Sequence, residues 1–415
     1  MTASKQRKQA CVSDCRIRAR QTKRGGHLMT ITRRLFIVGG MGAVSLGTGA
    51  VPRSSFAGDA QLPLSIAAKS PWMANQVALT SGNVMFLGLP RFPGHEETPS
   101  VAKRQSDGSI IPFPGGSWNN WKAGDDGQNA FVYVNSVHIF SDDTVWCVDQ
   151  GALRADASSK ELATPKPGAQ KLVQLDPDTG KVLRVIRFGD DILPPGAKMN
   201  DLRIYSNTIY ITDSGLGAII VHDLKTGETL RRLSARPEML ATPSPEPQIT
   251  PGKNRHATPK SDLIEVSADG AWLYWASPTG PFRRISTQAL HDRTVDDDAL
   301  ADKVEKMAVT PLVGGSAMDT LGNLYLSDLR AYRIILMTPT GQQTIIAADP
   351  GLISPDGGFI SVDRHLYIPA PQTERTELFG HPKDMTEKPF LIYAIQLPET
   401  FDSIRLGGPV TGRHV

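Results

Sequence analysis

One pattern occurs six times in this sequence of 415 residues, and the repetition constrains the fold more than any other feature. Each copy opens with a short run of alternating apolar character, turns, and resumes as a second apolar run. Internal repeats of a few tens of residues are typical of solenoids and propellers, in which each unit packs on its neighbours. The copies begin at Asn75, Asn135, Asn200, Asp262, Gly314 and Asp356.

A further hairpin completes the unit in at least three copies. The dipeptide Thr-Gly separates two additional strand-like runs within residues 172–188, 219–233 and 333–349. Turns rich in Gly, Asn and Asp are typical of tight hairpins, and the flanking Val, Ile, Tyr and Trp residues favour strands. Two hairpins per unit make four strands, which is one blade of a propeller. We therefore predict an all-β chain in which residues 58–415 form a six-bladed β-propeller.

Residues 1–57 precede the first repeat and differ from it in character. From Met29 they read as a short basic region containing Arg33-Arg34, an apolar stretch rich in Gly, and a small-residue cleavage pattern. This order is typical of a secretory signal, and the paired arginines indicate twin-arginine export. The apolar stretch is short for a membrane span, which takes about 20 apolar residues, so cleavage is favoured over an uncleaved anchor.

Several expectations follow from this N-terminal segment. We expect an N-terminal extension and twin-arginine signal peptide over residues 1–57, with translation from Met1 or Met29. The export machinery that reads paired arginines is then a partner of the precursor. The product is expected to be periplasmic or secreted, without a stable membrane span after cleavage.

The signal also accounts for the basic composition. The whole chain has 45 Lys and Arg against 42 Asp and Glu, and a sequence pI near 8.6. Eleven of the basic residues but one acid lie in residues 1–57, so the remainder has a net charge near −7. Such a chain gives no reason to expect a nucleic-acid partner. Cys147 is the one cysteine left, which excludes an intramolecular disulfide, and its strand-like surroundings predict a buried packing residue.

Two insertions interrupt the repeat, at residues 154–170 and 235–260. Both are rich in Pro, Ala, Ser or Thr and are predicted to be loops. Long loops on a compact fold are either functional covers or irregular surface segments. Both alternatives stay open: the loops cover one mouth of the central channel, or they lie elsewhere on the surface.

Alignment of the six copies places polar side chains at one level of the channel. The first strand of a blade lines the axis, so equivalent positions should face a common point. Five of the six first positions carry a side-chain oxygen, and such oxygens are the ligands that calcium prefers. The alternative is a purely structural role, in which Asn and Asp cap the starts of the strands. We assign Asn135, Asn200 and Asp262 as candidate ligands of Ca²⁺ or another divalent cation, and Asn75, Asp201 and Asp356 as candidate ligand-binding residues.

Other candidates are weaker. His138 and Arg203 occupy equivalent positions three residues beyond the ring, and the sequence leaves open whether they face the channel or the next strand. The chain after residue 57 contains no GxSxG elbow, HExxH pair, P-loop or CxxC pair.

The sequence resembles the yellow/major royal jelly protein family. The resemblance is carried by GLPRFPGHEETPSVAKRQSDGSIIPFPG after the first repeat, by VWCVDQG and KLVQLDPDTGKVLRVIRF, and by NDLRIYSNTIYITDSGLGAIIVHDLKTGETLRRL. It extends over residues 72–398. It implies a secreted six-bladed propeller, and some members bind small aromatic amines in the channel. Bacterial relatives are linked with dopachrome-tautomerase-type activity. The paired cysteines of the animal members are missing here.

A more distant resemblance is to gluconolactonase-like propellers. Their metal site uses Glu, Asn, Asn and Asp from successive inner strands, and Asn135, Asn200 and Asp262 match the last three in order. Asn75 stands where the Glu would be, which removes one negative charge. The resemblance implies a metal that polarises a lactone carbonyl, with Asp262 as the catalytic group assisting an activated water.

Three hypotheses for function follow. The leading one is a propeller that binds a small ligand, of aromatic or amine type, at the channel mouth. The second is a calcium-dependent lactonase. The third is a protein-interaction propeller that uses its outer surface.

Overall fold

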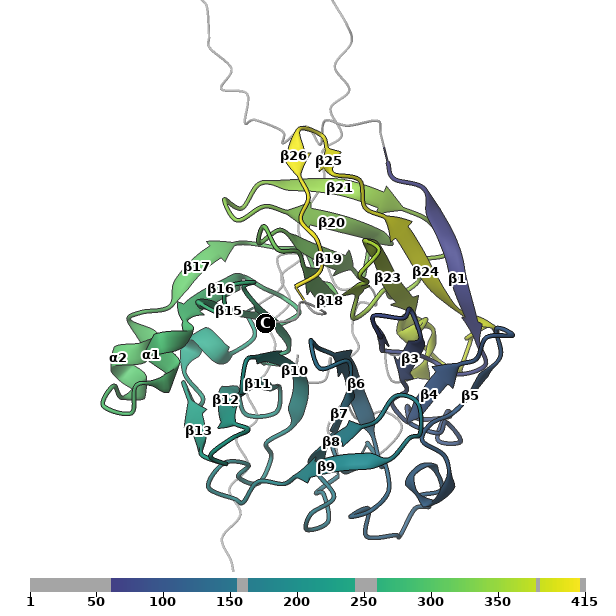
Figure 1. Cartoon of the computed structure of the whole chain (residues 1–415), viewed down its shortest axis with the longest axis horizontal. Helices are drawn as coiled ribbons and strands as arrows, with labels where there is room; N and C mark the ends of the chain where they lie inside the picture. Colours follow the sequence, from purple (N-terminus) through teal and green to yellow (C-terminus); the bar gives the residue numbers. More distant parts are fainter. Residues whose placement is uncertain (1–60, 155–162, 243–259, 378–380, 411–415) are drawn as a thin grey trace, which may run out of the picture. The chain divides into compact units, whose positions relative to one another are not determined.

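A computed structural model describes residues 61–154, 163–242, 260–377 and 381–410. Within these ranges the chain forms six four-stranded antiparallel sheets and a separate two-stranded hairpin. The sheets follow one another in chain order around a common axis (Figure 1), and we number them as blades 1 to 6. The predicted six-bladed β-propeller is confirmed.

The first five blades are each built from four consecutive strands, named here from the axis outward. Blade 1 consists of β2 (Gln76–Leu79), β3 (Met85–Gly88), β4 (Val101–Arg104) and β5 (Ile110–Pro112). Blade 2 consists of β6 (Val134–Ile139), β7 (Val145–Asp149), β8 (Lys171–Leu175) and β9 (Val182–Ile186). Blade 3 consists of β10 (Met199–Tyr205), β11 (Thr208–Asp213), β12 (Ala218–Asp223) and β13 (Thr229–Arg232). Blade 4 consists of β14 (Leu263–Val266), β15 (Trp272–Ala276), β16 (Phe282–Ser286) and β17 (Glu305–Ala308). Blade 5 consists of β18 (Val313–Met318), β19 (Leu324–Asp328), β20 (Arg333–Met337) and β21 (Gln343–Ala348).

Blade 6 is assembled from both ends of the described chain. Its strands β22 (Phe359–Ile360), β23 (His365–Ala370) and β24 (Phe390–Gln396) come from the last repeat. Its outermost strand is β1 (Leu64–Ser70), which pairs antiparallel with β24 from Leu64 opposite Ile395 to Ser70 opposite Phe390. The ring is therefore closed by hydrogen bonds between strands more than 300 residues apart. The repeat pattern does not predict β1, because its pairing partner is distant in the sequence.

The core consists of apolar side chains packed between neighbouring blades. One cluster joins blades 1 and 2 and includes Val77, Phe86, Val137 and Cys147. Cys147 is buried and free, as predicted, and its burial raises the pKa of the thiol far above the usual range. Such a thiol stays protonated and inert.

Short elements outside the blades decorate the edges. Helices α1 (Thr287–His291) and α2 (Asp297–Ala301) separate β16 from β17. Single 3₁₀ turns lie at Gly116–Asn119, Pro237–Met239 and Thr373–Arg375. In the described part of the chain no helix has the length and apolar character needed to cross a bilayer.

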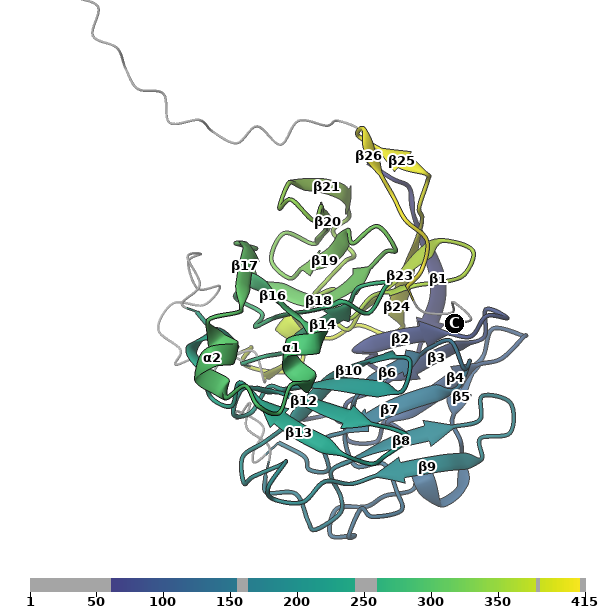
Figure 2. The same cartoon turned by 60° about the vertical axis from the view of Figure 1, so that its left-hand side comes forward.

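The C-terminal hairpin packs on the last two blades. Strands β25 (Thr400–Phe401) and β26 (Ile404–Arg405) form this hairpin, and Figure 2 shows it beyond β1 and β21. Phe401 and Leu406 are buried in a cluster with Ile346 of blade 5 and Ile395 of blade 6. The hairpin thus covers apolar surface where the ring is closed.

Two predicted segments fall outside the described residues. The N-terminal extension and signal of residues 1–57 lie there entirely, so the domain boundary after residue 57 stays a prediction. Most of the two insertions, residues 155–162 and 243–259, also lie there.

Candidate functional site

The inner strands are irregular at the level of the predicted ring. The pairing of β6 with β7 shifts between Val134 and Ser136, and that of β10 with β11 shifts between Met199 and Leu202. A β-bulge leaves its extra residue unpaired and re-aims the side chain. Asn135 and Asn200 lie at these bulges, so their amide groups are free to bond sideways from blade to blade.

A chain of hydrogen bonds joins four ring residues on consecutive blades. The Asn75 Nδ2 atom donates to the Asn135 carbonyl oxygen at 3.5 Å. The Asn135 Nδ2 atom donates to the carbonyl and Oδ1 oxygens of Asn200, at 3.2 Å each. The Asn200 Nδ2 atom donates to Asp262 Oδ1. The structure therefore brings Asn75, Asn135, Asn200 and Asp262 together, as the repeat alignment predicts.

Blade 5 contributes no side chain to the ring, and this determines where blade 6 lies. A Cβ atom on Gly314 would stand 2.4 Å from the Pro355 carbonyl oxygen, and one on Gly315 would stand 2.4 Å from the Gly357 Cα. The backbone on both sides of Asp356 thus packs directly on β18. The pair of glycines removes the side chain that would otherwise separate Asp262 of blade 4 from Asp356 of blade 6.

Blade 6 also bonds back to blade 1 and so completes the ring. The Gly357 N–H donates to the Asn75 carbonyl oxygen at 3.0 Å. The Ser327 hydroxyl of blade 5 donates to the Asp356 carbonyl oxygen at 2.8 Å. Asp356 is therefore held at the same mouth of the channel as the other ring residues.

The two ring carboxyl groups, Asp262 and Asp356, have raised pKa values. Both lie deep among protein atoms while part of their surface faces solvent. Burial, together with the charge of Asp201, raises the pKa of Asp262 to about 7, although Lys198 and Arg154 partly oppose the shift. Burial and the charges of Asp262 and Asp201 raise the pKa of Asp356 well above its usual range. Such shifts mean that the mouth would gain from a bound cation or proton.

A second polar layer lies one to three residues further along the inner strands. Arg203 donates from Nη1 to Asp201 Oδ2 at 2.8 Å, and from Nε and Nη2 to both oxygens of Glu265 at 3.0 and 2.8 Å. The Ser136 hydroxyl donates to Asp201, and the Ser316 hydroxyl donates to Glu265 Oε1 at 2.8 Å. Burial alone would lower the pKa of Arg203, but the two carboxylates outweigh it and raise that pKa. This layer links blades 2 to 5 and is satisfied internally.

The structure settles two positions that the sequence leaves open. Arg203 faces the next inner strand, where it pairs with Glu265. His138 is 4% exposed, and neither ring nitrogen has a hydrogen-bond partner among the residues that the structure describes. Burial, and then the charge of Arg203, lowers the pKa of His138 well below its usual range. His138 is therefore a neutral imidazole beside the ion-pair layer.

The donor set at the mouth does not fit a cation shared by Asn200 and Asp262. Asn200 Oδ1 accepts from Asn135 Nδ2, from Gln150 Nε2 at 3.3 Å and from the Ser214 hydroxyl at 3.1 Å. The Gln150 amide is oriented by its bond to the Met199 carbonyl at 3.0 Å. These donors turn the Asn200 NH₂ group, not its oxygen, toward Asp262. Metal coordination by both residues would require that amide to turn over and lose those bonds.

The described residues also contain no group of three or more His, Cys, Asp or Glu side chains arranged to hold a metal ion. Asn75 stands in place of an acid, so Asp262 is the one carboxylate among the four positions that match the gluconolactonase-like metal site.

Sequence reasoning missed one pair at the mouth. Tyr133, which precedes β6, is fully buried, and Arg154 Nη2 donates to its hydroxyl oxygen at 3.1 Å. Burial raises the pKa of Tyr133, and the charge of Asp356 adds to this, whereas Arg154 opposes it. Neither residue lies at a repeated position, so the alignment of repeats carries no signal for them. Asp201, a predicted ligand-binding residue, is occupied by Arg203 and Ser136.

Comparison with known proteins identifies the family. The family model described as "Major royal jelly protein" matches residues 132–346, which is more than half of the chain. The chain belongs to the major royal jelly protein family. The match runs from the start of blade 2 into β21 of blade 5 and therefore includes Asn135, Asn200 and Asp262. A search of curated proteins finds no match.

Solved structures similar to this family member share little sequence with it. A luciferin-regenerating enzyme has a TM-score of 0.50 at 8% identity, covering 84% of this chain and 99% of that chain. A gluconolactonase from Xanthomonas campestris has a TM-score of 0.49 at 12% identity, covering 82% and 91%. A calcium-binding protein, regucalcin from Agrobacterium tumefaciens, has a TM-score of 0.47 at 13% identity, covering 83% and 96%. At such identities the likeness concerns the fold alone.

Proposed function

We propose that this major royal jelly family member is an exported propeller that binds a small amine at the channel mouth. The observation that carries the proposal is the pair Asp262 and Asp356, two carboxyl groups brought to one mouth by the close packing of blade 6 on Gly314 and Gly315. An ammonium group at this mouth would stabilise the ionised forms of Asp262 and Asp356, since Lys198 and Arg154 stabilise that of Asp262 only in part. Carboxylates that share a buried site favour either a proton or a cation.

The neighbouring groups suit the same ligand. An ammonium group has three N–H donors and no acceptor, so it requires oxygens on several sides. Asp262 and Asp356 provide carboxylate oxygens, and the ring amides lie beside them. The family resemblance extends the proposal to amines that carry an aromatic ring.

Asp262 is also suited to move a proton. A carboxyl group whose pKa is about 7 both accepts and releases a proton readily near neutral pH. In a tautomerisation of the dopachrome type, one group removes a proton from carbon and a proton is returned at another position, with no net oxidation. This activity rests on the amine-binding site and is the finer part of the proposal.

Calorimetry with tyramine tests the binding. Tyramine carries an ammonium group and a phenol, whereas 4-ethylphenol has the same ring without the charge. We expect tyramine to bind at pH 8, 4-ethylphenol to bind at least tenfold more weakly, and Asp262→Asn to remove the difference. Asp302→Asn, the same change at an exposed position of blade 4, is the matched control. Equal affinity for both compounds would refute an ammonium site.

The calcium-dependent lactonase is the competing function. Its support is that Asn135, Asn200 and Asp262 are consecutive members of one hydrogen-bonded chain. It requires the Asn200 amide to turn over, as described above. Calcium titration of the purified protein separates the two. We expect the melting temperature to be the same in calcium and in chelator, whereas a stabilisation by calcium that Asp262→Ala abolishes would favour the lactonase.

Export is proposed from the paired arginines alone. A precursor with Arg33→Lys and Arg34→Lys should accumulate in the cytoplasm, because the export machinery reads the arginine pair. Cell fractionation measures this. Normal export of the double variant would refute the twin-arginine assignment.

A further inference from the structure

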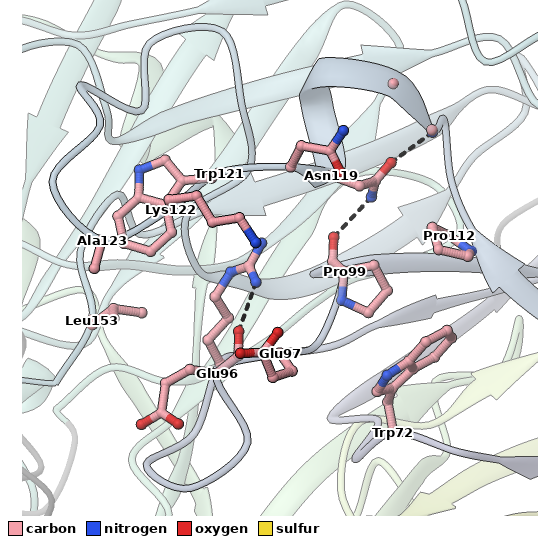
Figure 3. A pocket seen from close by; sticks show the side chains of 14 residues that line it. Trp72, Glu96, Glu97, Pro99, Pro112, Asn119, Trp121, Lys122, Ala123 and Leu153 are labelled. Atoms are coloured by element: carbon pink, nitrogen blue, oxygen red, sulfur yellow. Dashed lines mark hydrogen bonds between the residues drawn. The ribbon is translucent and has the colours of Figure 1, made fainter.

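A pocket lies outside the channel, among the loops of blades 1 and 2. Its volume is about 590 Å³, and Figure 3 shows the side chains around it. None of the ring residues lines it. Four segments build it: Trp72 before β2, residues 91–99 between β3 and β4, residues 112–123 after β5, and Leu153 after β7. In antiparallel blades these segments lie at the same end as the start of the inner strands, so the pocket and the channel mouth share one face.

The walls of this pocket are fixed by buried hydrogen bonds. The Arg91 side chain is 4% exposed and donates to the carbonyl oxygens of Val132 at 3.0 Å, Glu96 at 2.8 Å and Phe131 at 3.4 Å. The guanidinium carbon of Arg91 lies 5.6 Å from the centre of the Trp121 ring. The arginine therefore ties one loop to the chain before β6 and supports the indole from one side.

The opposite wall is fixed by an amide. The Asn119 Nδ2 atom donates to the carbonyl oxygens of Pro99 at 2.8 Å and Phe113 at 2.9 Å, and Asn119 Oδ1 accepts from the Gly115 N–H at 2.6 Å. Gly115 has a φ of +89°, and a Cβ atom there would meet nothing within 4 Å. The wall at this point is bare backbone beside open space. Because these walls are already held in place, ligand binding would lose little conformational entropy there, which favours affinity.

The lining combines flat apolar surfaces with polar groups of both signs. Trp72 and Trp121 are partly exposed, and Figure 3 shows them on opposite sides of the pocket. Pro99 and Pro112 add further apolar rings to the lining. The exposed polar side chains that line the pocket are Glu96, Glu97, Asn120 and Lys122.

The charges cancel. Two carboxylates, Glu96 and Glu97, face two cations, Arg91 and Lys122. A ligand of either sign would be attracted by one pair and repelled by the other. The pocket therefore suits an uncharged ligand that has one flat apolar face and several hydroxyl groups. The indole faces would pack on its C–H groups, and the amide, carboxylate and ammonium groups would bond to its hydroxyls.

We propose that this pocket binds the pyranose ring of a neutral carbohydrate. The site is independent of the amine site at the channel mouth, since the two share no residue. Trp72 and Trp121 pack on the sugar ring, and Asn120 and Lys122 bond to its hydroxyls.

A glycan array followed by calorimetry tests this proposal. The array carries neutral oligosaccharides of glucose, galactose, mannose and xylose beside sulfated, uronic-acid and sialylated ones. We expect binding to neutral glycans, and calorimetry with the strongest of them to show a loss of at least fivefold for Trp72→Ala. Asn120→Ala, at an exposed position, should weaken binding severalfold without affecting folding. Its melting curve verifies the folding.

Two controls make the outcome decisive. Trp272→Ala removes another partly exposed indole, on β15 of blade 4, where it packs 4.4 Å from the Arg284 guanidinium, and should leave glycan affinity unchanged. Asp262→Asn should also leave it unchanged, which separates this site from the amine site. The proposal is overturned if no neutral glycan binds, if only charged glycans bind, or if Asn120→Ala and a folded Trp72→Ala both retain full affinity.

Discussion

The channel has two polar layers at neighbouring positions of the inner strands, and their carboxyl groups differ in the partners they have. At the mouth, burial and nearby carboxylates raise the pKa values of Asp262 and Asp356. One to three residues further along the strands, the carboxylates of Asp201 and Glu265 share the guanidinium of Arg203. The carboxyl groups of the first layer have raised pKa values, whereas those of the second are paired with a guanidinium by hydrogen bonds.

Under our proposal, the ring position of the repeat binds the ligand, and the positions that follow it stabilise the packing of the blades. A buried carboxylate that is paired and hydrogen-bonded ties blades together, whereas one left beside another carboxylate is available to a ligand. We therefore propose that the mouth binds the ligand and that the layer below links the blades. The predictions that follow test this division.

The largest expected effect is on the paired layer. Arg203→Ala would leave Asp201 and Glu265 buried without their cation, and removing one partner of a buried ion pair costs about 3–5 kcal/mol. Chemical denaturation measures the free energy of unfolding. Arg284→Ala is the control, because Arg284 pairs with the exposed Glu305 and surface pairs contribute about 0–1 kcal/mol. Similar losses for the two variants would show that the buried layer has no special role.

The next effect concerns the approach of blade 6 to blade 5. Gly315→Ala would place a Cβ atom 2.4 Å from the Gly357 backbone, and overpacking of this kind costs about 1–3 kcal/mol. Asp356 would be displaced from Asp262, so tyramine affinity should fall as well. Gly408→Ala is the control, since a Cβ atom there meets nothing within 4 Å. A variant that loses stability but keeps its tyramine affinity would contradict our account of how the two carboxyl groups are brought together.

A smaller effect of opposite sign is expected at the mouth. The native pKa of Asp262, about 7, lies above its ordinary value of 3.8, so the folded protein holds this proton more tightly than the unfolded chain does. The resulting stabilisation is complete below pH 3.8 and is lost as the pH rises toward 7. Asp262→Asn removes this loss and should raise the free energy of unfolding at pH 7.5 by on the order of 1 kcal/mol.

Denaturation of both proteins at pH 4, 6 and 7.5 measures this effect. The gap between variant and wild type should widen with pH. Asp302→Asn, at an exposed position, should show no such trend. If the wild type were the more stable protein at pH 7.5, Asp262 would have to be stabilised by a partner in the native state.

The blades and the ring could be predicted from the sequence because both depend on short-range patterns. Alternating apolar residues around Gly-rich turns specify hairpins, and six aligned hairpins place Asn135, Asn200 and Asp262 at one level. Strand β1 could not be predicted this way, since residues 64–70 pair with residues 390–395 and have no neighbouring hairpin. Helices α1 and α2 belong to an insertion in one blade and have no counterpart in the described parts of the other repeats.

The chemistry of the site was less predictable than its location. The orientation of the Asn200 amide depends on Gln150 and Ser214, which directly follow β7 and β11, so the alignment alone favoured a metal ligand. The pairing of Arg203 with Glu265 depends on how far the bulge in β10 shifts that strand. The proximity of Asp356 to Asp262 depends on Gly314 and Gly315, which have no functional side chain that a motif search would detect.

The affinity for tyramine as a function of pH tests the amine site most directly. Calorimetry between pH 5.5 and 8.5 should show affinity rising up to tenfold per pH unit below about 7 and then levelling, as Asp262 ionises. In Asp262→Asn the affinity should be low, and its rise across this range should be lost. A wild-type affinity that does not change with pH, or that requires added calcium, would contradict the assignment of the channel mouth as an amine site.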